Sequence, residues 1–255
     1  MKILVCVKRV PTVGGAITLT PDRLAIDTKA SGFTISPHEE CAVEEAVRLV
    51  ERFGGSVTVV TLGPAVAEEQ LRACLALGAS AAVLIETEPG VEVGPIATAA
   101  ALHSVAADRG FDLVLLGNEA SDTGDYQVGI RLAHLLGWPA ATAIKALAVD
   151  DDAGGVSASR TYRGVLETFA LELPCVVTVK EGINLPRYPS LPGRLRAKRA
   201  AITRVPGPAA RADGDVRMTS LRVPDAPKKQ ATVLGQGAAA VPALVDVLVE
   251  LGVVS

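Results

Sequence analysis

The amino-acid sequence predicts an α/β protein with a doubly wound, mainly parallel sheet, late antiparallel strands and a C-terminal tail. In the first half of the chain, short apolar runs alternate with helical segments of about 10–15 residues, as in parallel sheets covered on both faces. Hydrophobic residues make up 49% of the 255 residues, which is ample for a sizeable core. The longest apolar stretches are broken well before the ~18 residues that a membrane span requires. We therefore expect one or two globular domains and no integral membrane protein.

The first half of the chain contains the elements of this sheet in order. The expected strands are 3–10, 56–62, 81–85 and 112–116, and the expected helices begin after Ser36, at 64–77 and at 95–109. A loop at 11–15 and a small hairpin at 17–27 follow the first strand. Because the first and fourth strands of such sheets commonly flank the point where strand order reverses, the loops after them should converge on one crevice.

The segment SPHEECAVEEAVRLVERF carries the clearest helix signal. Ser36 and Glu39 have the spacing of a capping box, and Pro37 occupies the first helical position. His38 stands in the same first turn, where backbone N–H groups and the helix dipole favour anions, so it is a candidate ligand contact. The glutamates at 44–45 are expected on a solvated face of this helix.

After residue 139 the pattern changes to short strands separated by turn signals. The expected strands are 143–149, 156–162, 165–173 and 175–179. They should extend or flank the sheet, and two of them should form a hairpin. From residue 182 the chain is rich in proline and then basic, and residues 206–232 resemble a linker before a last apolar helix at 239–251. We therefore expect a domain boundary after residue 205.

The loop 117–129, GNEASDTGDYQVG, is the main candidate site because it stands where a parallel strand should end. Its carboxylates, Glu119, Asp122 and Asp125, are a possible acid–base pair or magnesium site. Its glycine, serine and amide residues, with the helix N-terminus that follows, are typical of loops that bind adenine nucleotides through backbone amides. These residues alone leave both interpretations open.

Other chemical motifs are absent or weak. The chain lacks the GxxxxGK[ST] phosphate loop, so nucleotide hydrolysis by that machinery is not expected. GQGAAA at 235–240 resembles a dinucleotide fingerprint but is followed by neither a second strand nor a suitably placed acidic residue. The four cysteines lie in apolar surroundings without a CxxC pair, which predicts buried thiols. They are Cys6, Cys41, Cys74 and Cys175.

The charge pattern does not indicate nucleic acid. Net charge is −3, and the basic run 194–204 has no aromatic residues for base stacking. A solvated or docking surface is the expected role of that run. The N-terminus lacks the long apolar core and cleavage site of a signal peptide, so a cytoplasmic location is expected.

Three stretches taken together resemble the β subunit of electron transfer flavoprotein. They are ILVCVKRV at 3–10, SPHEECAVEEAVRL at 36–49 and GVLETFALELPCVVTVKEGINLPRYPSLPGRLRAKRAAI at 164–202. The resemblance runs in order from Met1 to about Ile202, with a looser match in the last helix, and its final stretch is highly specific. It implies a Rossmann-like, adenine-nucleotide-binding fold.

The resemblance implies an electron carrier rather than an enzyme. Members of this family pair with an α subunit that holds most of the FAD site, and the β subunit buries an AMP that does no redox chemistry. The pair accepts electrons from flavin dehydrogenases, such as the acyl-CoA dehydrogenases of fatty acid oxidation, and passes them to a membrane quinone reductase. Residues 1–205 would then form the nucleotide-binding domain, including a recognition loop at 182–200. Residues 206–255 would form a linker and a helix that packs on the partner subunit.

Matching positions imply which residues make contacts. The cofactor-binding set is Cys6, Ser36, Pro37, His38, Glu39, Leu62, Gly117, Asn118, Glu119, Ala120, Ser121, Asp122, Thr123, Gly124, Asp125, Tyr126, Gln127, Val128 and Glu167. The phosphate is expected near 125–128, and Glu167 matches an acidic residue that faces the flavin across the subunit boundary. The partner-docking set is Pro186, Arg187, Tyr188 and Leu191. Leu191 matches an anchor leucine that enters a pocket on partner dehydrogenases.

Some positions depart from the family pattern. Val13 stands where some members have a tyrosine near the flavin ring, and Gly124 and Tyr126 stand where others have acidic and amide residues. In electron-bifurcating members a second FAD occupies the same cavity, beside a loop closer to DGDTAQVG. AMP is the expected ligand, with a second FAD as the alternative. A free-standing ATP-binding enzyme, with Asp122 and Asp125 as metal ligands, is the competing class.

Overall fold

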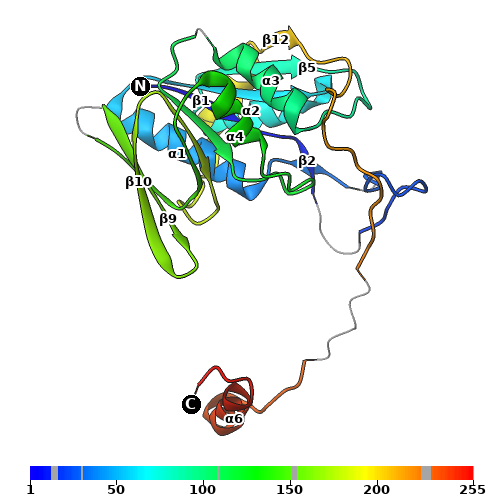
Figure 1. The fold of residues 1–255 in the computed structure, drawn as a ribbon, viewed down its shortest axis with the longest axis vertical. Coiled ribbons are helices and arrows are strands. Elements are labelled where there is room, and N and C mark those ends of the chain that lie inside the picture. The colour runs from blue at the N-terminus through cyan, green and yellow to red at the C-terminus, as the bar shows by residue number, and fades with distance from the viewer. Residues whose placement is uncertain (13–16, 30, 108, 151–153, 225–230, 255) are drawn as a thin grey trace. The chain divides into compact units, whose positions relative to one another are not determined.

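Residues 1–12, 17–29, 31–107, 109–150, 154–224 and 231–254 are described by the structure, a computed structural model of the chain (Figure 1). The chain divides into two compact units, Met1–Thr219 and Ser220–Ser255. A seven-stranded sheet in the order β12-β5-β4-β1-β6-β11-β7 forms the centre of the first unit. Its strands are β1 (Lys2–Cys6), β4 (Ser56–Gly63), β5 (Ala81–Glu86), β6 (Leu113–Gly117), β7 (Ala140–Ile144), β11 (Cys175–Val179) and β12 (Thr203–Pro206). All neighbouring strands in it run parallel, which confirms the predicted fold class.

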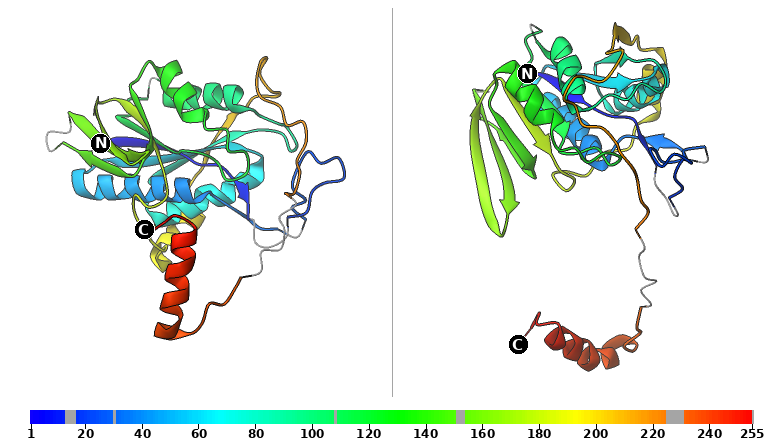
Figure 2. Two further views of the ribbon diagram at one scale, coloured as in Figure 1. Left: turned by 60° about the horizontal axis from the view of Figure 1, so that its bottom comes forward. Right: turned by 45° about the vertical axis from the view of Figure 1, so that its right-hand side comes forward.

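Helices cover both faces of this sheet (Figure 2). One face carries α1 (Pro37–Phe53), α2 (Glu68–Leu77) and α5 (Leu191–Arg199), and the other carries α3 (Pro95–Ala106) and α4 (Val128–Leu136). Successive strand residues alternate between the two resulting cores: Val59 belongs to the first and Val60 to the second. The four cysteines are free and buried, as predicted.

β1 lies near the middle of the sheet and marks its switch point. From β1 the chain continues to β4 and β5 on one side, and then crosses back to β6 on the other side. Strand order therefore reverses between β1 and β6. The segments that follow Cys6 and Gly117 leave the sheet in the crevice between them, where open α/β sheets bind ligands.

The late strands divide between two sheets. β7 and β11 join the central sheet, whereas β8 (Ala146–Val149), β9 (Gly155–Tyr162) and β10 (Val165–Glu172) form an antiparallel sheet. β9 and β10 are the predicted hairpin. The prediction of a single strand at 143–149 is wrong, because these residues belong to two strands in two different sheets. β7 ends at Ile144 and β8 begins at Ala146, so the chain passes from one sheet to the other at Lys145. Ala143, with a φ of 58°, lies inside β7, where the pairing with β11 shifts register.

Three smaller predictions also need correction. The first strand is shorter than expected, and β2 (Val10–Pro11) instead pairs antiparallel with β3 (Phe33–Thr34). The hairpin expected at 17–27 is reduced to one bridge between Leu19 and Ile26. β12 was not expected, because its largely exposed residues show no alternation of apolar and polar side chains. It pairs in parallel with β5 at the edge of the sheet. Val13 lies outside the described residues.

The glutamates of α1 are buried rather than solvated. Glu44 and Glu45 are 2% and 9% exposed, so their predicted position on a solvated face is wrong. The segment after β11 covers this part of α1, and Asn184 Nδ2 donates to Glu45 Oε2 at 2.9 Å. Helical periodicity could not reveal this burial, because the covering residue lies 139 positions away in the sequence.

The second unit contains a short 3₁₀ turn, Gly237–Ala240, followed by α6 (Val241–Glu250), which agrees with the expected last helix. None of the described residues of α6 is buried, and Leu244, Val245 and Val249 are exposed. Within the described ranges, every helix is too short or too polar to traverse a lipid bilayer.

Candidate functional site

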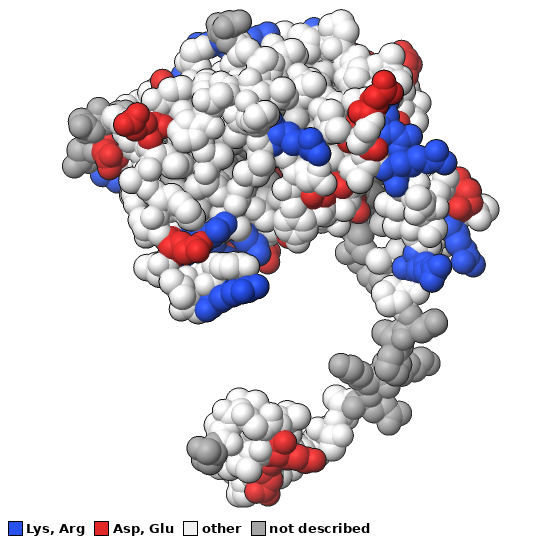
Figure 3. Space-filling view, in the orientation of Figure 1, with Lys and Arg blue, Asp and Glu red and all other residues white. Residues whose placement is uncertain are grey.

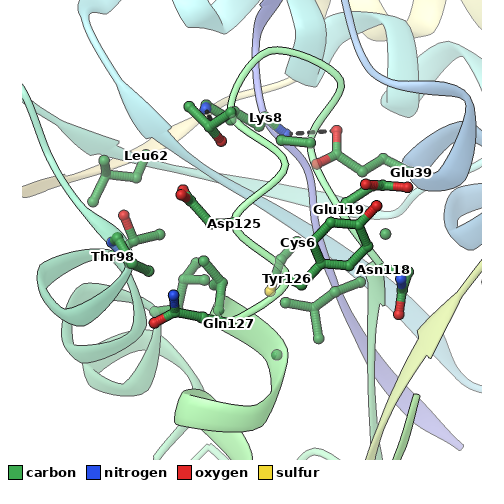
Figure 4. Close-up of a pocket in the computed structure, with 18 of the residues that line it drawn as sticks. Cys6, Lys8, Glu39, Leu62, Thr98, Asn118, Glu119, Asp125, Tyr126 and Gln127 are labelled. Atoms are coloured by element: carbon green, nitrogen blue, oxygen red, sulfur yellow. Dashed lines mark hydrogen bonds between the residues drawn. The ribbon is translucent and has the colours of Figure 1, made fainter. Parts of the chain in front are cut away.

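A pocket lies at the carboxyl edge of the central sheet, at the switch point (Figure 4). About 790 Å³ of space lies within the pocket and its open mouth. Cys6, Leu62 and Leu116, at or near the ends of β1, β4 and β6, form part of its lining. Other lining residues come from the segment after β1, from Glu39 of α1, from α3, from the first turn of α4 and from the loop before α4. The predicted convergence of the loops after the first and fourth strands is therefore confirmed.

Most of the residues implied as cofactor contacts line this pocket. They are Cys6, Glu39, Leu62, Gly117, Asn118, Glu119, Ala120, Thr123, Asp125, Tyr126, Gln127 and Val128. Ser36, Pro37 and His38 stand just before Glu39, at the start of α1, without lining it. Ser121, Asp122 and Gly124 belong to the same loop but do not face the cavity.

Sequence reasoning missed several residues of the pocket. They are Val7, Lys8, Val93, Pro95, Thr98, Leu102 and Leu116, whereas Gly129 belongs to the candidate loop 117–129. Lys8 lies two residues beyond the end of β1, whereas the sequence placed it inside the strand expected at 3–10, so its position at the switch point was not recognised. Thr98 and its neighbours on α3 carried no signal, because only the packing of α3 against α4 brings them to the cavity.

The loop before α4 turns sharply at two residues with positive φ. Gly124 and Tyr126 have φ values of 58° and 56°, and the Gly124 N–H donates to the Ala120 carbonyl at 2.9 Å. The chain then enters α4, whose first residues, Val128 and Gly129, line the pocket. Because a helix N-terminus carries unpaired N–H groups and the positive end of the dipole, this wall favours an anionic group such as a phosphate.

Two glycines permit close approach of elements around the pocket. A Cβ on Gly117 would lie 2.7 Å from Cγ of Glu39, and a Cβ on Gly129 would lie 2.4 Å from Cγ2 of Thr178. Side chains cannot approach so closely without displacement. Gly117 thus lets the first turn of α1 reach the end of β6, and Gly129 lets α4 pack on β11.

Lys8 links the segment after β1 to the loop after β6. Its Nζ donates to Asp122 Oδ1 at 2.7 Å and to Thr123 Oγ1 at 3.3 Å. The two side chains are 38% and 22% exposed, so solvent screens the ion pair and its contribution to stability is about 0.2–1 kcal/mol. Its main effect is to hold the loop after β6 against the segment after β1.

Glu39 is a buried carboxyl group in the wall of the pocket. Its Oε2 accepts hydrogen bonds from the backbone N–H of Lys8 at 2.9 Å and of Ser36 at 3.3 Å. The second of these bonds is the Glu39 half of the predicted capping box. Burial raises the pKa of Glu39 to about 8, against the two N–H donors and the Lys8 charge, which favour the carboxylate.

His38 lies beside the same loop in a neutral state. Its Nδ1 is buried, has no hydrogen-bond partner among the described residues, and is 3.9 Å from Glu119 Oε1. Burial lowers the pKa of His38, which the nearby Glu119 only partly opposes, so the imidazole is uncharged near neutral pH. Cys6 is equally inert, because burial and then the charge of Glu39 raise the pKa of its thiol.

The acidic residues of the loop do not form a metal site. Among the described residues, no group of three or more histidine, cysteine or acidic side chains is arranged to hold a metal ion. Asp122 is instead paired with Lys8. The alternative in which Asp122 and Asp125 act as metal ligands therefore has no geometric support.

Glu167 lies apart from this pocket, on β10. Its Oε2 accepts from Arg160 Nε at 2.7 Å, and Arg160 Nη1 also donates to the backbone carbonyl of Thr142 at 3.0 Å. Arg160 lies opposite Glu167 on the neighbouring strand β9. The carboxylate is thereby held in one orientation on the antiparallel sheet.

The four docking residues differ in exposure, and Pro186 is half-buried. Arg187 points inward and pairs with Glu44 and Glu51 of α1. Tyr188 and Leu191 point outward, with 94% and 72% of their surface exposed. Leu185 is 84% exposed and was missed, although it directly precedes the Pro186 named in the docking set.

Charges on the first unit form small groups of both signs. On the face shown in Figure 3, basic and acidic side chains are scattered among uncharged surface. Arg204, the last member of the basic run, pairs with Glu86 and Glu68. Among the described residues on that face, the continuous basic surface expected of a nucleic-acid-binding protein is not found.

Comparison with known proteins points to one family. The chain matches the family model described as electron transfer flavoprotein domain over residues 23–210. It is 37% identical over 203 residues to the electron transfer flavoprotein subunit beta of Bacillus subtilis (strain 168), covering 79% of this chain and 77% of the relative. It is 35% identical over 236 residues to the human subunit beta, covering 91% of this chain and 92% of the relative. The mitochondrial subunit beta of Oryza sativa subsp. indica is 35% identical over 237 residues, with coverages of 92% and 93%.

Proposed function

The chain belongs to the electron transfer flavoprotein family as a β subunit, and from this we propose that it pairs with an α subunit and binds AMP as a structural ligand. The single observation that carries the AMP assignment is the pocket at the switch point. It combines the N-terminus of α4, a loop rich in backbone donors and an apolar floor. These are the groups that a phosphate, a ribose and an adenine ring respectively require.

The charges of the pocket favour one phosphate over two. Among its lining residues Lys8 is the cation, and it is already paired with Asp122, whereas Glu119 and Asp125 are acidic. A pyrophosphate would bring more negative charge than one helix N-terminus can offset, and such groups normally recruit further arginine or lysine side chains. AMP therefore suits this lining better than a second FAD.

The α subunit holds most of the FAD in this proposal, and the flavin supplies the redox chemistry. This chain contributes one wall of that site through Glu167, which Arg160 holds in place. Its C-terminal helix α6 packs on the α subunit, because its apolar residues are unburied within their own unit. The chain therefore acts as an electron-carrier subunit and catalyses no bond-making step itself.

Electrons arrive from flavin dehydrogenases, such as acyl-CoA dehydrogenases, and leave to a membrane quinone reductase. The docking contact is Leu191, with Tyr188 beside it on the same exposed segment. A few exposed apolar side chains on a polar loop suit a brief encounter, because weak electron-transfer contacts use small interfaces.

Nucleotide identification tests this proposal. The chain is co-expressed with its α subunit, the pair is isolated by size exclusion, and the ligands released by denaturation are identified by chromatography. We expect one FAD and one AMP per pair. Two FAD molecules without AMP would instead support the bifurcating alternative.

A second measurement separates the carrier from a free-standing ATP-binding enzyme. We expect the isolated pair to show no magnesium-dependent ATP hydrolysis above the background of a mock purification. Robust hydrolysis that disappears in Asp125→Ala would contradict the carrier function.

A further inference from the structure

Glu39 is the most deeply buried acidic side chain in the wall of the nucleotide pocket. It is the third residue of α1, is 6% exposed, and faces the cavity beside Gly117. A buried carboxyl group at a ligand site is unusual, because burial penalises the charged form. What Glu39 contributes to ligand binding follows from its two oxygen atoms.

The two oxygens of Glu39 have different surroundings. Oε2 accepts two backbone N–H groups, from Lys8 and Ser36, and Figure 4 shows Glu39 beside Lys8 at the cavity wall. Among the described residues, Oε1 has no hydrogen-bond partner. Because the lone pairs of Oε2 are occupied by donors, a proton on this carboxyl group must reside on Oε1. The neutral acid therefore presents one O–H donor that the protein does not use.

The groups that face Glu39 allow this neutral form. They are Lys8 and Asp122, which form a direct ion pair, and the thiols of Cys6 and Cys74. The charge of Lys8 lowers the pKa of Glu39, and the charge of Asp122 raises it. Glu119 lines the same pocket. Burial raises the pKa of Glu39 to about 8, so the group is mainly protonated at pH 7. Burial raises the thiol pKa values as well, so the cysteines stay neutral in this range.

We propose that Glu39 donates a hydrogen bond from Oε1 to an acceptor atom of the nucleotide in this pocket, and that nucleotide binding is thereby coupled to one proton. The inference rests on the proposed function, since it takes an adenine nucleotide as the ligand. The ionised side chain would offer only acceptors and would add a negative charge beside an anionic ligand, so the protonated form binds more tightly.

Equilibrium dialysis of labelled AMP against the nucleotide-depleted heterodimer tests this coupling between pH 7 and pH 9. A phosphate monoester has its second pKa near ~6, so the charge of AMP is constant over this interval. If only the protonated form of Glu39 binds, the dissociation constant should rise about tenfold from pH 7 to pH 9. The rise should begin near the pKa of Glu39 and not at lower pH.

Glu39→Gln is the decisive variant, because its amide can accept the same two N–H groups through oxygen and donate through nitrogen at every pH. We expect it to bind AMP at pH 7 within about twofold of the wild type and to lose the pH dependence. Glu39→Leu removes the donor and should bind weakly at both pH values. Flavin content and circular dichroism establish that each variant is folded and assembled.

Glu40→Gln is the matched control, one residue further along α1 and outside the pocket lining. It should keep the wild-type pH dependence. A Glu39→Gln variant with the wild-type slope, or a wild-type dissociation constant that is constant from pH 7 to pH 9, would overturn the inference while leaving AMP binding intact. A wild-type pair that binds no AMP at any pH would contradict the proposed function itself, and this inference with it.

Discussion

Arg187 and Glu44 join the segment after β11 to the middle of α1. Arg187 Nε lies 2.9 Å from Glu44 Oε2, its Nη2 lies 3.1 Å from Oε1, and its backbone N–H donates to Oε2 at 3.1 Å. Glu51, two turns later on α1, accepts from the other side of the guanidinium at 2.6 Å. Burial opposes ionisation of Glu44, but the hydrogen bonds from Arg187 and Arg48 outweigh it and lower its pKa. The segment that carries the exposed residues Tyr188 and Leu191 is therefore fixed to α1 through Arg187.

Replacement of Arg187 should loosen the attachment of this segment to α1. In Arg187→Ala, the buried Glu44 keeps only Arg48 as a charged partner, so the free energy of unfolding should fall by about 1–3 kcal/mol. Urea unfolding followed by circular dichroism measures the change. Arg194→Ala, an exposed arginine on α5, is the control and should stay within about 0.5 kcal/mol of the wild type. Equal effects of the two substitutions would mean that the guanidinium does not anchor the loop.

Leu191 should matter for electron transfer and not for folding. Leu191→Ala removes an exposed apolar contact, so the heterodimer and its flavin should be unchanged while reduction by a partner dehydrogenase slows about tenfold, equivalent to ~1.4 kcal/mol. Stopped-flow absorbance of the flavin measures the rate. Val66→Ala, a similarly exposed apolar residue in the short 3₁₀ turn Ala65–Ala67, serves as the control and should leave the rate unchanged. An unaltered rate in Leu191→Ala would remove the anchor role.

Gly117 should be essential for the pocket. The new Cβ in Gly117→Ala would push against Cγ and the backbone N of Glu39, 2.7 and 3.2 Å away, and displace the first turn of α1. We expect AMP retention to fall at least tenfold and stability to fall by about 1–3 kcal/mol. Released nucleotide per flavin and urea unfolding provide the two readouts. In Gly63→Ala the nearest neighbour is Ala67 Cβ at 3.4 Å, an ordinary contact, so that variant should retain AMP.

Asp215 should stabilise the start of α3, which borders the pocket. Its two carboxylate oxygens accept the backbone N–H groups of Ile96 and Ala97 at 3.0 and 3.1 Å, and so act as a cap supplied from a distant part of the chain. Asp215→Ala should cost about 1 kcal/mol, the usual value of a helix N-cap. Faster hydrogen exchange at Ile96 and Ala97 would localise the effect to this helix end. Asp213→Ala, two residues earlier and exposed, should leave that exchange unchanged.

Local sequence signals predicted much of the fold correctly. The start of α1 was readable from Ser36, Pro37 and Glu39, because capping depends on residues three positions apart. The alternation of strands and helices predicted the parallel sheet and its switch point, since crossover handedness and sheet edges follow general rules. The single strand expected at 143–149 was wrong, because the chain passes from one sheet to another at Lys145, within a run that contains neither glycine nor proline.

The order of the elements, the candidate loop 117–129 and the family of the chain could all be read from local sequence patterns. The contacts between side chains at this loop depend on packing between distant segments. Lys8 reaches Asp122, Gly117 admits Glu39, and the segment containing Asn184 and Arg187 buries the acidic face of α1. Burial and pKa are properties of surfaces brought together from distant parts of the chain, so no local pattern of residues specifies them.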